Sequence, residues 1–108
     1  MHVHPIDSLG SINPVAGFHG RVVHGEDCTL VFWTIDAGAE LPTHDHPHEQ
    51  VATILEGEFE LTVDGETRTL GVNDIVPIPG GVPHGGKAIT ATRMLDVFRP
   101  KRDDLKPA

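Results

Sequence analysis

Short apolar runs, cut at close intervals by Gly, Pro, Asn and Asp, limit the folds open to this chain. The runs are rich in Val, Ile, Thr and Phe, which favour strands, and no helical period is sustained. Strands this close together, without crossover helices, cannot build a parallel sheet. We therefore predict an all-β sandwich or barrel, with strands over 21–24, 29–36, 49–55, 58–63, 67–70, 74–78, 86–90 and 93–98.

The clearest local prediction is a hairpin over 58–70. From Phe59 to Val63, apolar residues alternate with polar residues, which places the apolar ones on one face of a strand. Asp64-Gly65 follows, and this dipeptide suits the tight type I′ turn that joins antiparallel strands. The segment therefore supplies two neighbouring strands of the predicted barrel.

Length and charge narrow the class of protein. A chain of 108 residues suits one compact domain over 1–108, with a barrel core at about 19–99. The formal net charge is −8 and no Lys/Arg cluster is present, so nucleic acid is not an expected partner. No window approaches the roughly 18 apolar residues of a membrane span, and the start has no signal-like pattern. We expect a cytoplasmic protein without a membrane partner.

Two further expectations concern single segments. The only cysteine, Cys28, excludes an internal disulfide, and its position beside the strand-like run TLVFW predicts an inert, buried thiol. The tail 101–108 is charged and rich in polar residues, so we expect it to fray at its end.

Eight histidines are many for so short a chain, and some of them form a pattern that suits a metal site. In the segment THDHPHEQ, His44 and His46 would point the same way on a strand, and Gln50 has the same parity. His84, between two Gly/Pro turns, can supply a further ligand. Neutral imidazole suits Zn, Ni, Cu and Fe ions, while an amide oxygen is a weaker, harder donor. We predict that one divalent ion is bound by His44, His46, Gln50 and His84.

The alternative is that these histidines decorate a surface loop, which is the commoner fate of a single histidine. Three histidines with a matching Gln favour the metal site. Pro47 breaks the strand register before His48, so His48 is left out of the ligand set. The remaining histidines show no partner pattern and are not predicted as ligands: His2, His4, His19 and His24.

The stretch from Gly38 to Gly57 resembles the first cupin motif, in which a glycine, His-x-His, an acidic ligand and a second glycine follow at set spacings. Gln50 stands where that motif usually carries Glu. The second motif is matched by Pro79, Gly81 and His84; Asn73 takes the place of its opening glycine and Ala88 that of its closing Asn. Asn tolerates a left-handed backbone. The resemblance implies a single-domain cupin barrel of the jelly-roll type.

A narrower resemblance rests on HPHEQ, LEGEFELTVDGET, VPHG.K and LDVF.P.R. These segments look like the KdgF-type cupins, which convert 4,5-unsaturated uronate monosaccharides from pectin or alginate breakdown into linear keto forms. That family carries Gln as a ligand. The resemblance implies one divalent transition metal ion (Ni, Zn, Mn or Fe), a small anionic sugar acid as substrate, and a homodimer. It also implies functional roles for Asp96, Phe98 and Arg102.

The last predicted strand leaves one question open. Asp96 and Phe98 share one face, and Leu95 and Val97 share the other, so alternation alone does not say which face lines the interior. The resemblance favours Asp96 near the metal, where burial would raise its pKa and the metal would lower it. We expect Asp96 to move a proton and Phe98 to pack against the sugar ring. Arg102 would pair with the carboxylate, although an exposed tail arginine is the commoner fate.

Other functions stay open at this point. A neutral ligand set with Gln favours Lewis-acid chemistry, but three histidines also suit an iron-dependent oxygenase. Cupin lyases that act on sulfonium compounds rely on a tyrosine, and this chain has none. A non-catalytic module that binds a metal or a small ligand is a further alternative.

Overall fold

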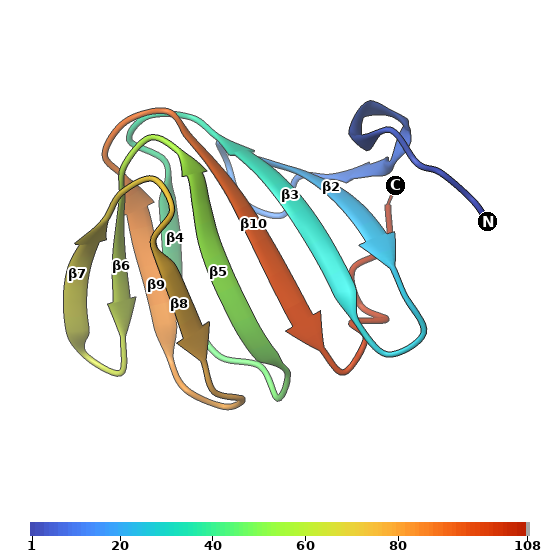
Figure 1. Cartoon of the computed structure of the whole chain (residues 1–108). Coiled ribbons are helices and arrows are strands. Elements are labelled where there is room, and N and C mark those ends of the chain that lie inside the picture. The colour runs from blue at the N-terminus through green and yellow to red at the C-terminus, as the bar shows by residue number, and fades with distance from the viewer. Residues whose placement is uncertain (108) are drawn as a thin grey trace.

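The fold consists of two β-layers, and the computed structural model describes it for residues 1–107. Within this range, two antiparallel sheets lie face to face as a jelly roll (Figure 1). The same residues include no helix long and apolar enough to span a membrane, and their helical structure is the short 3₁₀ turn η1 (Ile6–Ser8). In spatial order, the larger sheet contains β1 (Gly10–Ile12), β2 (Phe18–His24), β3 (Thr29–Ile35), β10 (Thr92–Arg99), β5 (Glu49–Glu56) and β8 (Ile75–Ile78). The smaller sheet contains β4 (Glu40–His44), β9 (His84–Ala88), β6 (Phe59–Val63) and β7 (Glu66–Leu70).

All the predicted strands are present, although several begin or end a few residues from the predicted bounds. The predictions missed two strands, β1 and β4. In β4 every residue except Leu41 is exposed and Pro42 interrupts the run, so no apolar alternation marks it. Pro42 is compatible with the strand because β4 is an edge of the smaller sheet.

The predicted hairpin is confirmed. Strands β6 and β7 pair from Phe59 opposite Leu70 to Val63 opposite Glu66. Both turn residues have positive φ, 48° at Asp64 and 80° at Gly65, as a type I′ turn requires. Asn73 also adopts the left-handed backbone (φ 72°) expected of it.

The interior lies between the two sheets and is filled by alternate residues of the central strands. On β10, residues 92, 94, 96 and 98 are buried and those between them are half-buried. Asp96 and Phe98 therefore face the interior, while Leu95 and Val97 face outward. This answers the question that alternation alone left open.

One expectation needs correction. Cys28 is half-buried, not buried, because it lies in the turn between β2 and β3, where Gly25 N–H donates to its carbonyl at 2.8 Å. The tail is held against the barrel along its described part: Leu105 packs against the core, and Pro107 lies against Gly10. The prediction that the tail frays at its end falls partly on residue 108, outside the described residues.

Candidate metal centre and cavity

Three histidines come together at one end of the barrel. His44 closes β4 and His84 opens β9, and the strand register places these two residues opposite each other. His46 joins them from the loop that follows β4, with its ring centre 4.9 Å from that of His84. The nearest ring nitrogens of the three lie within 4.8 Å of one another, so the group could hold one metal ion.

The way these residues converge differs from the predicted one. His46 lies beyond the end of β4, and Gln50 belongs to β5 in the other sheet, so the parity of a single strand does not align them. The segment between β4 and β5 instead crosses from the smaller sheet to the larger one. Side chains from both layers thereby meet at the same end of the interior.

Backbone carbonyls select the tautomer of each ring. Every Nδ1 lies within hydrogen-bond distance of a main-chain oxygen two residues away: His44 with Pro42 at 2.9 Å, His46 with His48 at 3.0 Å and His84 with Val82 at 2.9 Å. A carbonyl oxygen can only accept, so each Nδ1 carries the proton and each Nε2 keeps a lone pair. Such contacts orient histidines that bind metals.

The donor atoms fit a cation. His84 is only 2% exposed, yet its Nε2 has no hydrogen-bond partner among the described residues. His46 Nε2 lies 3.1 Å from Gln50 Oε1, so two buried electron-pair donors face each other. Burial lowers the pKa of both His46 and His84, which keeps the rings neutral at pH 7. Three imidazole nitrogens and an amide oxygen suit a divalent transition metal ion.

A cavity of about 300 Å³ lies beside this cluster, between the sheets. Its polar lining comes from His44, Gln50, His84, Asp96 and Arg102. Apart from the indole N–H of Trp33, the remaining lining is apolar. It includes Phe98, Phe59, Leu61 and Met94. Small-molecule sites have volumes of about 300–1,000 Å³, so this one suits a single small ring.

Asp96 is a buried carboxylate on the wall of the cavity, 5% exposed. Its Oδ2 accepts a hydrogen bond from the Trp33 indole at 2.9 Å, while Oδ1 has no partner among residues 1–107. Burial raises the pKa of Asp96 to about 6, and the Gln50 and Trp33 side chains and the Arg102 charge oppose a larger rise. In the protein without a metal ion, the effect of burial therefore dominates.

Arg102 is not the exposed tail arginine of the alternative prediction. Its side chain is 15% exposed, lines the cavity, and lies over the Phe98 ring with Cζ 4.7 Å from the ring centre. Nε and Nη2 donate to the Asp104 carboxylate at 3.2 and 2.7 Å. Nη1 makes no hydrogen bond within the described part of the chain. The guanidinium is thus held along one edge and has donors to spare.

The predicted site residues other than His44 are at least partly buried, and all lie around one cavity or cluster. Three of the other histidines lie apart from the cluster, since His19 faces Asp36 at 3.3 Å on the surface and His2 stacks on His4. The His48 ring, in contrast, lies 5.8 Å from that of His46, although His48 is not among the three residues that could share one ion. Sequence reasoning missed Trp33 and Asp104. Trp33 shares the inward parity of β3, which was a usable signal, whereas nothing in the sequence marks the pairing of Asp104 with Arg102.

Comparisons with known proteins agree with the fold. The cupin domain family model matches residues 31–98. The chain is 29% identical over 86 residues to the pectin degradation protein KdgF of Dickeya dadantii, covering 78% of each chain. It is 43% identical over 61 residues to the dimethylsulfoniopropionate lyase DddQ of Ruegeria pomeroyi, covering 56% of this chain but 27% of the lyase.

Solved structures extend this likeness over nearly the whole fold. The structure of KdgF from Halomonas sp. superposes with a TM-score of 0.85 at 28% identity, covering 93% of this chain and 94% of that one. Because the family model spans more than half of the residues, this chain belongs to the cupin family, with its overall likeness to the KdgF type.

Proposed function

We propose that this cupin binds one divalent transition metal ion (Ni, Zn, Mn or Fe) through His44, His46, Gln50 and His84 and opens the ring of 4,5-unsaturated uronates. The main support for the proposal is the buried carboxylate of Asp96, which lines the same cavity as His44 and His84. The likeness to a pectin degradation protein supports the choice of substrate. When bound, the ion would supply Lewis acidity toward substrate oxygens, undiminished by any anionic ligand.

Asp96 has the properties of a proton carrier. A 4,5-unsaturated uronate is a cyclic enol ether with a hemiacetal, so ring opening is an isomerisation. Asp96 would take the proton of the hemiacetal hydroxyl as the bond from C1 to the ring oxygen breaks, which leaves an aldehyde and an enolate. Returning that proton to C4 gives the ketone, so atoms balance. In the metal-free protein, burial raises the pKa of Asp96 to about 6, close to the range in which a group can both accept and donate a proton near neutral pH.

Arg102 and Phe98 would bind the substrate. Nη1 of the Arg102 guanidinium makes no hydrogen bond within residues 1–107, and this free edge matches the geometry of a carboxylate. The Phe98 ring, 3% exposed, lies between Arg102 and His46, with its centre 5.6 Å from that of the His46 ring. A sugar ring beside this aromatic ring would have its carboxylate next to the arginine.

The proposal predicts that purified, metal-loaded protein speeds the loss of the ultraviolet band of unsaturated galacturonate or guluronate monomers. The acceleration should disappear with chelator and return with added metal. The measurement is a time course of absorbance against the spontaneous rate. An unaccelerated reaction with a full complement of metal would rule out this substrate, and oxygen uptake with Fe(II) would then indicate the oxygenase alternative. The absence of both activities would favour a binding module.

We also propose that two copies pair through the outer face of the larger sheet. On this face, the register places Phe32 opposite Leu95 and Leu30 opposite Val97, and none of these half-buried residues belongs to the core. Ile75, 62% exposed, extends the apolar surface onto β8. A self-complementary apolar face of this kind suits a twofold pair.

Replacing Leu95 with Glu should therefore convert a dimer to a monomer, because it places a charge in the middle of that face. Light scattering after gel filtration measures the change in mass. Ile89→Glu is the matched control, since Ile89 is 45% exposed and follows β9 in the other sheet. A wild-type protein that already runs as a monomer would contradict the proposal.

A further inference from the structure

We propose that Thr29 and His24 are positioning residues, which latch the carboxyl-terminal segment 101–107 across the barrel and thereby place Arg102 at the cavity. The inference rests on the proposed function in one respect: Arg102 is taken to bind the substrate carboxylate. The latch itself is a feature of the fold.

One row of residues across three strands carries the segment. The register places Phe98 of β10 opposite Thr29 of β3, and Thr29 opposite His24 of β2. After β10 the chain turns back and passes β3 toward β2 (Figure 1). The Arg102 guanidinium lies over Phe98, the Arg102 backbone lies at Thr29, and the Leu105 carbonyl lies at His24.

When the His24 ring is neutral, the donor and acceptor of each hydrogen bond in the latch can be assigned in only one way. Arg102 N–H donates to Thr29 Oγ1 at 2.9 Å. The Thr29 hydroxyl then donates to His24 Nδ1 at 2.7 Å, so Nε2 of that ring carries the proton and donates to Leu105 O at 3.1 Å. Because Thr29 is fully buried, water cannot replace its hydroxyl without a change in packing. The chain of bonds therefore ties backbone atoms at two points of the segment to one buried side chain.

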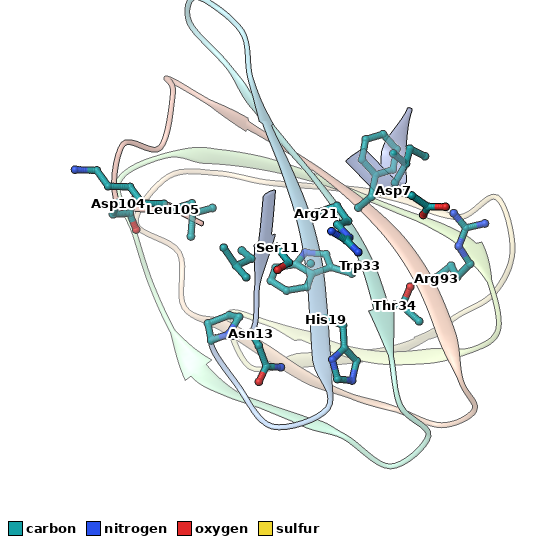
Figure 2. A pocket seen from close by; sticks show the side chains of 16 residues that line it. Asp7, Ser11, Asn13, His19, Arg21, Trp33, Thr34, Arg93, Asp104 and Leu105 are labelled. Carbon is teal, nitrogen blue, oxygen red and sulfur yellow. The ribbon is translucent and has the colours of Figure 1, made fainter. Parts of the chain in front are cut away.

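The latched segment also forms a wall. Leu105 lines the cavity beside the three histidines and also a larger groove of about 920 Å³. Figure 2 shows Asp104 and Leu105 at one side of that groove and Trp33 within it. Pro14, Trp33 and Leu105 border both hollows, so release of the segment would join them. The same segment includes Asp104, whose carboxylate accepts two hydrogen bonds from the Arg102 guanidinium and so orients it.

Thr29→Val tests the latch because valine has nearly the same shape and lacks the hydroxyl. The protein is loaded with Zn²⁺, which is diamagnetic and has no redox chemistry. Two quantities are measured: amide hydrogen exchange at Leu105 N–H, which donates to Arg102 O at 3.2 Å, and the Kd of saturated galacturonate, a non-reacting probe. Zinc content per chain is measured alongside. Thr29→Ser keeps the hydroxyl, and Asp103→Asn is the control, since exposed Asp103 contacts Lys101 alone among the ion pairs of residues 1–107.

We expect Thr29→Val to speed exchange at Leu105 roughly 5- to 30-fold, because the segment opens more often. The Kd for galacturonate should rise roughly 2- to 12-fold, since binding must now order the Arg102 side chain. Zinc content should stay unchanged. Under the proposed reaction, KM should rise more than kcat falls. Thr29→Ser and Asp103→Asn should behave like the wild type. His24→Leu, which removes the bond to Leu105, should reproduce the effect and serves if the valine variant does not fold.

Unchanged exchange at Leu105 in Thr29→Val or His24→Leu would overturn the latch. Faster exchange with an unchanged Kd would overturn the positioning role, provided that Arg102→Ala raises the Kd. If Arg102→Ala also leaves the Kd unchanged, Arg102 does not bind the carboxylate. That outcome refutes both the proposed binding of the substrate carboxylate by Arg102 and the positioning role of Thr29 and His24. The exchange rate at Leu105 still tests the latch.

Discussion

Replacing Asp96 with Asn should lower turnover of unsaturated uronates by about 10²–10⁴-fold, the usual contribution of general acid–base catalysis. Asn has the shape of Asp and can still accept the Trp33 hydrogen bond, but it cannot carry the proton. Metal content should stay at the wild-type level because Asp96 is outside the proposed ligand set. Steady-state rates and metal analysis measure both quantities. Wild-type turnover in the variant would end the role assigned to Asp96.

The same variant should stabilise the metal-free protein above pH 7. The pKa of Asp96 is about 6 in the folded protein and near 3.8 when unfolded, so the folded state binds more protons between these values. The contribution of Asp96 to wild-type stability therefore falls as pH rises from about 4 to about 6, by at most about 3 kcal/mol. Asn has no charge to bury. The difference in the free energy of unfolding between Asp96→Asn and the wild type should be near zero below pH 4 and reach its full size above pH 7.

Urea unfolding of chelator-treated protein at pH 4 and pH 7.5 measures this difference. Asp103→Asn is the matched control, because Asp103 is exposed and its replacement should leave the pH dependence unchanged. A difference between Asp96→Asn and wild type that does not vary with pH would show that the carboxylate is not destabilised by burial.

His44→Ala should weaken metal binding by more than about 100-fold, since loss of a supporting contact alone costs 10–100-fold. His44 is the exposed member of the cluster, so its removal should leave the metal-free fold intact. The stabilisation that metal gives the wild type, about 4 kcal/mol at 1,000 times the Kd, should fall to about 1.4 kcal/mol or less at the same metal concentration. Titration calorimetry and thermal unfolding with and without metal measure both effects.

His48→Ala is the control for this experiment. His48 lies in the same tract, and its carbonyl, which a side-chain substitution keeps, accepts the bond from His46 Nδ1. Metal binding should be unchanged in this variant. Equal losses in both variants would show that the ligand set differs from the proposed one.

The strands could be predicted where side chains alternate, and could not where they do not. The run from Phe59 to Val63 has clear alternation and a turn that its own residues determine, so both strand and hairpin were correct. The exposed strand β4 has no such pattern, because its place depends on pairing with β9. The proposed ligand residues were chosen by their types and spacing, yet their meeting point depends on a crossing between sheets that spacing does not describe.

The direction of the Asp96 pKa shift could not be predicted from the sequence for a related reason. It depends on how completely the carboxylate is buried and on which groups face it, and these come from β3, β5 and the segment after β10. The fate of the tail also depended on distant residues. Its charged composition is typical of a free end, whereas the hydroxyl that holds it belongs to Thr29, far away in the sequence.

The crossing of the barrel by the segment after β10 bears on how such chains are classified. The family model matches residues 31–98, a range that includes the four proposed ligands and Asp96. Arg102, Thr29 and His24 lie outside it. Under the proposed function, two chains can therefore share every residue that identifies the fold and the proposed metal site and still differ in the anion they select. Sorting such chains by substrate requires aligning the flanking segments as a pair, because the arginine and the residues that hold it come from opposite ends of the matched domain.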